Sequence, residues 1–142
     1  MSSFKEVFSS IPGKTDYIQQ DLDVGDATPV KLPPYRISPK YASVMQKELN
    51  YMLGLGLISP CIRPWSSPVT LQPKPDGSAR FCIDYRRVNA PRKTDTYPLP
   101  RLEECIGSIG TSKFISKLNL KQGFWQVPLT DRAREVSCFV VS

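Results

Sequence analysis

The chain has 142 residues, and lysine and arginine outnumber aspartate and glutamate by 19 to 13, which gives a formal net charge of +6. Its 14 prolines exclude a long coiled coil, and its eight glycines show no triplet period, which excludes collagen. Because 40% of the residues are hydrophobic, the composition indicates a basic globular domain rather than a disordered chain.

The first two predicted elements are an extended arm and a helix. Residues 1–37 show weak periodicity, and prolines such as Pro33 favour an extended backbone there. Ser38 can cap a helix and Pro39 suits its first turn, while Gly54 is a typical end. Apolar side chains then recur at three- and four-residue spacing and form one helix face, namely Tyr41, Val44, Met45, Leu49, Met52 and Leu53.

A β-hairpin is predicted next. Two strand-like runs, 68–72 and 78–85, flank a loop that contains the turn dipeptide Asp76-Gly77. Prolines stiffen this loop, and we expect Lys74 to lie near its tip.

The last third of the chain predicts a short helix and two further strands. The helix begins at Leu99-Pro100 and ends at Gly110, and residues 113–120 and 137–141 have strand-like patterns. The helix carries an apolar face of Leu102, Cys105, Ile106 and Ile109. Because the last strand is apolar and reaches the end of the sequence, we expect its sheet to be completed by another segment or another molecule.

Several classes of site are excluded by the residue types. The sequence has no histidine, which rules out Ser-His and Cys-His nucleophiles and histidine acid–base chemistry. Its four cysteines are widely spaced, so we expect no zinc site and instead four buried free thiols in a reducing, intracellular compartment. We also expect no secretory signal at residues 1–6 and no membrane span, because no apolar run in the sequence is long enough to cross a membrane.

Seven stretches together resemble one family, the reverse transcriptases of gypsy-type LTR retrotransposons. They include FCIDYRRVN at 81–89 and FISKLNLKQGFWQV at 114–127. The full set, in order, is 23–29, 34–36, 56–60, 64–69, 74–89, 97–101 and 114–127. Each stretch is weak alone, but their order and spacing make the resemblance specific.

The resemblance implies an α+β fold, the fingers and partial palm of a right-hand polymerase, with a mixed or antiparallel sheet and helices. Residues 1–37 would be the N-terminal extended arm, 38–112 a fingers-like subdomain, and 113–142 a partial palm. The family's Tyr-x-Asp-Asp hairpin would follow the last of these residues.

The resemblance also predicts that the chain does not catalyse polymerisation. The family uses two Mg²⁺ ions held by carboxylates, and Asn119 occupies the position of the first catalytic aspartate. An amide offers one neutral oxygen, so we expect no intact catalytic residue, no metal ligand and no bound cofactor in this chain. Asn119 fits an engineered knockout or a decayed copy as well as a domesticated descendant.

Two groups of binding residues follow from the same resemblance. The expected nucleotide-binding residues are Lys74, Arg80 and Phe124, and the expected template-binding residues are Trp65, Asp84 and Arg86. A solvated turn for Lys74 and core packing for Phe124 and Trp65 remain open alternatives. The basic run of Arg86, Arg87, Arg92 and Lys93 suits either the template path or a solvated face.

Three functions remain open. The chain is expected to be a non-catalytic fragment or domesticated remnant that binds RNA or DNA, mostly through phosphate contacts. It could instead be a protein-interaction module that forms a homodimer, or binds a partner protein, through the exposed edge of its sheet. It could also be a piece of an ordinary retroelement polyprotein. None of these functions involves a membrane.

Overall fold

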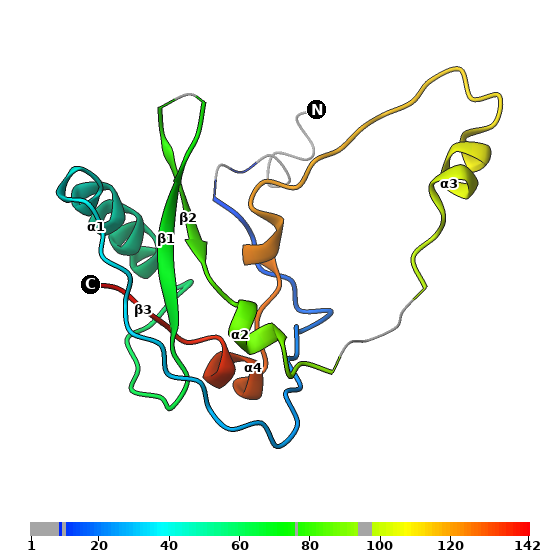
Figure 1. Ribbon diagram of the computed structural model, residues 1–142. Coiled ribbons are helices and arrows are strands. Elements are labelled where there is room, and N and C mark those ends of the chain that lie inside the picture. Colours follow the sequence, from blue (N-terminus) through cyan, green and yellow to red (C-terminus); the bar gives the residue numbers. More distant parts are fainter. Residues whose placement is uncertain (1–8, 10, 76, 94–97) are drawn as a thin grey trace.

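The protein has an α+β fold, as predicted. The computed structural model describes residues 9, 11–75, 77–93 and 98–142. Along the chain, the elements are α1 (Pro39–Gly54), β1 (Ser67–Pro73), β2 (Ala79–Ile83), α2 (Arg86–Asn89), α3 (Leu102–Ile109), the 3-10 helix η2 (Gly123–Gln126), α4 (Asp131–Val136) and β3 (Phe139–Val140) (Figure 1).

A three-stranded mixed sheet organises the fold, with strand order β2-β1-β3. The predicted hairpin is confirmed: β1 and β2 pair antiparallel, from Val69 opposite Ile83 to Pro73 opposite Ala79. Gly77 has a φ of 78° in the turn, a left-handed conformation that glycine adopts without strain, while Asp76 lies outside the described residues. The final strand, β3, runs parallel to β1 and is shorter than the predicted 137–141.

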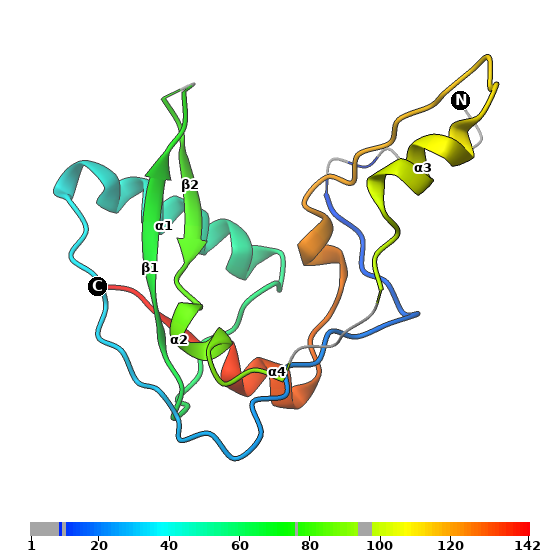
Figure 2. The same ribbon diagram turned by 45° about the vertical axis from the view of Figure 1, so that its right-hand side comes forward.

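Helix α1 packs along the hairpin, as Figures 1 and 2 both show. Met45 and Met52 are its buried side chains, which confirms part of the predicted apolar face. Pro39 occupies the first turn, but the Ser38 side chain makes no capping hydrogen bond, so this part of the prediction is wrong. The helix starts with the fixed φ of proline rather than with a side-chain cap.

A small core forms where the sheet meets α2 and α4. Its buried members are Trp65, Val88 and Val136, and Val24, Ala27, Val30 and Tyr85 pack against them. The Tyr85 hydroxyl donates a hydrogen bond of 2.7 Å to the backbone carbonyl of Ser137. This bond ties the end of the hairpin to α4, and it satisfies a polar group at the edge of an apolar cluster.

The N-terminal arm is extended, and it pairs with distant parts of the chain. Gln20 forms a parallel bridge with Leu129, and Lys31 forms one with Ser66. The Ser66 hydroxyl donates to the carbonyl of Leu32 at 2.9 Å. The arm therefore wraps the fold from 15 to 32, while residues 1–8 and 10 lie outside the described part.

Residues 98–122, called the excursion below, project away from the sheet (Figures 1 and 2). The excursion contains α3, whose existence is confirmed, although the predicted apolar face is exposed rather than buried. The predicted strand at 113–120 is wrong, because these residues form no helix or strand. An alternating pattern becomes a strand only beside a partner that completes its hydrogen bonds, and within the described residues 113–120 have none.

The four cysteines are free thiols, but the prediction that all are buried is wrong. Cys61 and Cys105 are exposed, and Cys82 and Cys138 are partly buried. No helix among the described residues has the length and apolar character needed to cross a membrane.

Candidate nucleic-acid-binding surface

The β1–β2 hairpin carries two exposed cations. Its turn is closed by hydrogen bonds from the Lys74 N–H to the Ser78 carbonyl at 2.8 Å and from the Gly77 N–H to the Lys74 carbonyl at 3.0 Å. Arg80 stands on β2 opposite Gln72. Both Lys74 and Arg80 are exposed, as a phosphate-binding role requires.

The face of the sheet that carries Arg80 follows from strand alternation. Ile83 lines the same cavity as Leu49 and Leu53 of α1, so Ile83 faces α1. Side chains alternate along a strand, which places Phe81 with Ile83 and turns Arg80 and Cys82 to the opposite face. Arg80 thus projects from the side of the sheet that α1 leaves open.

Two predicted template-binding residues are joined as an ion pair. The Arg86 guanidinium donates from Nε to Asp84 Oδ1 at 2.9 Å and from Nη2 to Asp84 Oδ2 at 2.7 Å. Tyr35 adds a hydroxyl hydrogen bond to Asp84 at 3.1 Å. These bonds, led by those from Arg86, hold the pKa of Asp84 well below its usual range. The Asp84 side chain is largely covered, while that of Arg86 is 85% exposed and presents its other N–H groups to solvent.

Trp65 lies in the core, where it is only 5% exposed. Its indole packs with the buried cluster that includes Val88 and Val136. The structure thus gives Trp65 a packing role, and its contact with a template base stays a prediction.

Asn119 lies in the excursion, and Phe124 lies directly after it. Phe124 belongs to η2 and is 97% exposed, so the core-packing alternative does not describe it. Its neighbour Trp125 instead contacts Tyr51 of α1, with ring centroids 6.2 Å apart. Asn119 is exposed in the irregular segment before η2. Among the described residues, no hydrogen bond, ion pair or ring contact joins Phe124 to the hairpin cations.

The predicted basic run divides into two parts. Arg86 and Arg87 are exposed, and the helix α2 that carries them continues directly from the hairpin. Lys93 is paired with Asp23 at 3.5 Å, and its N–H donates to the Asp23 carbonyl at 2.9 Å. Lys93 is also exposed, but it fastens the arm through Asp23.

An ionic cluster between the arm and α4 was missed from the sequence. Arg132 pairs with Asp21 and, at 3.5 Å, with Asp23, while the Thr130 hydroxyl donates to Asp21 at 2.6 Å. The hydrogen bond from Arg132 is the main reason that the pKa of Asp21 falls to about 2. The repeated aspartates at 21 and 23 were the available signal, but Arg132 lies more than 100 residues from both of them in the sequence, and Lys93, the other partner of Asp23, lies 70 residues away.

The donor set does not fit the magnesium site that the family resemblance implies. The described residues contain no group of three or more His, Cys, Asp or Glu side chains that could hold a metal ion. Asn119 is exposed and supplies only a neutral oxygen.

Comparison with known proteins gives a consistent set of relatives, although no protein-family model matches the chain. The chain is 29% identical over 130 residues to the retrovirus-related Pol polyprotein from transposon 412 of Drosophila melanogaster, covering 87% of the chain and 10% of that protein. It is also 29% identical over 123 residues to the Pol polyprotein from transposon gypsy of Drosophila melanogaster, covering 82% of the chain and 12% of that protein. The chain thus spans about a tenth of the length of these relatives.

Solved structures of foamy virus proteins share the fold. A protease-reverse transcriptase of prototype foamy virus superposes with a TM-score of 0.85 at 25% identity, covering 98% of this chain and 19% of that one. A foamy viral protease-reverse transcriptase in complex with double-stranded DNA gives a TM-score of 0.75 at 23% identity, covering 98% of this chain and 28% of that one. The resemblance found in the sequence is confirmed: the chain is similar to gypsy-type, retrovirus-related Pol polyproteins and to the protease-reverse transcriptases of foamy viruses.

Proposed function

We propose that this chain is the fingers and first palm portion of an RNA-directed DNA polymerase that binds nucleic acid without extending a primer. The observation that carries the binding proposal is the pair of exposed cations on the hairpin, Lys74 and Arg80, on or beside the open face of the sheet. Arg86 and Arg87 extend this cationic surface toward α2. The formal charge of +6 supports a polyanionic partner, and a foamy viral relative is described in complex with double-stranded DNA.

The geometry favours contacts to phosphates over contacts to bases. A guanidinium suits phosphate oxygens because it donates two parallel hydrogen bonds, and a lysine acts as a point charge. Phe124 is 97% exposed, so its ring is available for stacking on a sugar or base. We expect affinity for single strands and RNA–DNA hybrids with little sequence preference.

The absence of catalysis is proposed from the chemistry of Asn119. Replacing a carboxylate by an amide removes a unit charge about 4 Å from a dication, which at an effective dielectric of about 20 forfeits on the order of several kcal/mol of attraction. A domesticated descendant and a decayed or engineered copy of a polyprotein segment predict the same biochemical behaviour. The proposal therefore concerns what the chain does and not how Asn119 arose.

A salt titration tests the binding proposal. Fluorescence anisotropy with a single-stranded oligonucleotide should give an association constant that falls linearly with salt on logarithmic axes, by about 0.7 for each phosphate neutralised. Lys74→Ala and Arg80→Ala should each lower the affinity and reduce this slope by about 0.7. The matched control is Lys47→Ala, because Lys47 is an exposed lysine on α1. Absence of binding at low salt, or equal losses for all three variants, would refute a phosphate-binding hairpin.

A second candidate function is protein interaction, and the excursion favours it. Its apolar side chains are strongly exposed, with Leu99 at 84%, Phe114 at 94% and Leu118 at 89%. Within the part of the chain that the structure describes, β2 and β3 are the two edges of the sheet, and each can take up another strand. Sedimentation should then show a concentration-dependent dimer, and a strict monomer at high concentration would remove this candidate.

A further inference from the structure

Two cysteines from opposite parts of the sequence meet in the fold. The Sγ atoms of Cys61 and Cys138 are 3.2 Å apart, although the residues are 77 positions apart in the chain. Cys61 lies in the irregular segment between α1 and β1, and Cys138 directly precedes β3. The pairing of β3 with β1 holds Cys138 in place, since the Ser67 N–H donates to the Cys138 carbonyl at 3.0 Å.

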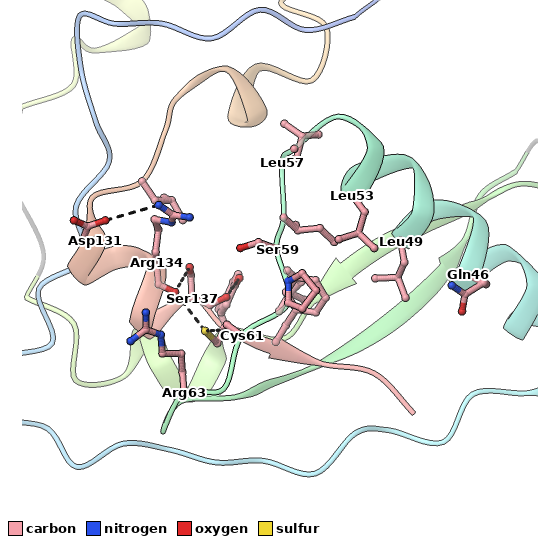
Figure 3. Close-up of a pocket in the computed structure, with 18 residues that line it drawn as sticks. Gln46, Leu49, Leu53, Leu57, Ser59, Cys61, Arg63, Asp131, Arg134 and Ser137 are labelled. Carbon is pink, nitrogen blue, oxygen red and sulfur yellow. Dashed lines mark hydrogen bonds and ion pairs between the residues drawn. The ribbon is translucent and has the colours of Figure 1, made fainter.

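The thiol pair lies in the wall of a cavity of about 610 Å³ between α1, α4 and β3 (Figure 3). Both cysteines also line a second cavity of about 480 Å³, which extends toward the arm at Lys31 and Leu32. Cys61 is exposed and Cys138 is only partly buried, so a small solute can reach the pair. The position of the thiols is therefore compatible with a reaction in the folded state.

The two thiols differ in their exposure and in the groups around them, so we expect them to react in different ways. Burial, together with the Cys61 contact, raises the pKa of Cys138 to about 11, while the nearby Arg63 guanidinium opposes this rise. The Cys138 thiol is also within 3.4 Å of the Arg134 carbonyl, which accepts its weak hydrogen bond. Cys61 has no such cover, so it is the sulfur that an oxidant meets first.

We propose that Cys61 and Cys138 form a redox-active dithiol that a peroxide oxidises to an intramolecular disulfide. The Cys61 thiol releases its proton, and its sulfur attacks a peroxide oxygen. The O–O bond breaks, Cys61 becomes a sulfenic acid, and the hydroxide that leaves takes up the released proton to form one water. The Cys138 sulfur then attacks the Cys61 sulfur, the S–O bond breaks, and the hydroxide leaves with the Cys138 proton as a second water. The two thiols lose two electrons, and hydrogen peroxide is reduced to two waters.

The disulfide would fasten the loop before β1 to the strand that pairs with it. It closes a long loop, which restricts the unfolded chain far more than the folded one. Oxidation should therefore raise the melting temperature by roughly 10 °C or more. This inference is independent of nucleic-acid binding, so failure of either leaves the other standing.

Peptide mapping of the whole chain tests the proposal. Reduced protein is treated with a small excess of hydrogen peroxide, free thiols are alkylated, and tryptic peptides are measured by mass spectrometry. We expect one cross-linked pair containing Cys61 and Cys138, with the loss of two hydrogens and a raised melting temperature.

The other cysteines supply a matched control. Cys61→Ser and Cys138→Ser should each abolish the cross-link and the rise in melting temperature. Cys105→Ser should retain both, because Cys105 is an exposed thiol on the distant helix α3. A cross-link that includes Cys105, disulfides only between molecules, or oxidation of Cys61 to sulfinic acid with Cys138 still reduced would each overturn the proposal.

Discussion

Replacement of Trp65 by alanine separates its packing role from its predicted template role. The indole is 5% exposed, and it joins Val88 and Val136 at the junction of the sheet with α2 and α4. A buried tryptophan covers about 150–250 Å² of surface, which at about 25 cal/mol per Å² corresponds to about 4–6 kcal/mol. Measured losses for Trp→Ala in cores are about 3–5 kcal/mol. We therefore expect Trp65→Ala to lose about 4 kcal/mol of folding free energy.

The assay is urea denaturation followed by far-UV circular dichroism, because the substitution itself removes the fluorescence of one of the two tryptophans. With a slope of about 2 kcal/mol per M urea, the midpoint should fall by about 2 M. Since a domain of this kind has about 5–15 kcal/mol in total, part of the variant can be unfolded without denaturant. Trp65→Phe keeps an aromatic ring in the cluster, and it should lose less and remain folded.

Phe124→Ala is the matched control, because it removes an aromatic ring that is 97% exposed. Its stability should change by less than about 0.5 kcal/mol. The reasoning would be refuted if Trp65→Ala kept the midpoint of the parent protein but lost affinity for a single-stranded oligonucleotide. The indole would then have to be free to stack on a base.

Two further predictions concern Tyr85 and Asn119. Burial raises the pKa of Tyr85 from 10.0 to about 12, so its contribution to stability is complete below pH 10 and is lost as the pH rises through 12. Tyr85→Phe leaves the Ser137 carbonyl without its 2.7 Å hydrogen bond, which should lower the free energy of unfolding by about 0.5–1.5 kcal/mol at pH 7. Urea denaturation at pH 7 and pH 11 should show that the variant loses less stability at the higher pH than the parent protein does. The alkaline loss that remains is expected from Cys138, whose pKa is also raised. Asn119→Asp in this chain alone should give no primer extension with Mg²⁺ and dNTPs, because one carboxylate does not make a two-metal site. Measured extension would contradict the reasoning that further carboxylates are needed to hold two metal ions.

The elements that could be predicted are those encoded by neighbouring residues. The hairpin follows from two strand-like runs around a glycine turn, and α1 follows from its apolar spacing and Pro39. These signals act over a few residues, so no distant partner is needed to recognise them.

The elements that could not be predicted depend on distant partners. Residues 113–120 alternate like a strand, yet no neighbouring strand in the described part of the chain completes their hydrogen bonds. The ionic cluster of Asp21 with Arg132 joins residues 111 positions apart, and no local pattern announces it. The same is true of the contact between Cys61 and Cys138.

For the binding surface, the sequence predicted residue types better than their environments. Lys74 and Arg80 are exposed, as phosphate contacts require. Asp84 and Arg86, however, form an ion pair with each other. The residue types alone do not reveal this pairing. Arg87 is the other cation on α2, and no ion pair found among the described residues includes it.

The way the arm is held has a consequence for the order in which the fold can be completed during synthesis. Residues 20 and 21 leave the ribosome before their partners at 128–132, which follow more than 100 residues later. The β1–β2 hairpin can form as soon as both strands are made. The contacts of the arm with residues 128–132 and the pairing of β1 with β3 can form only after the segment that carries α4 and β3 has been made. Until then Trp65 lacks the Val136 side of its cluster, so the nascent chain exposes an indole that the finished protein covers. A chaperone or ribosome-bound factor would meet this protein chiefly during that interval.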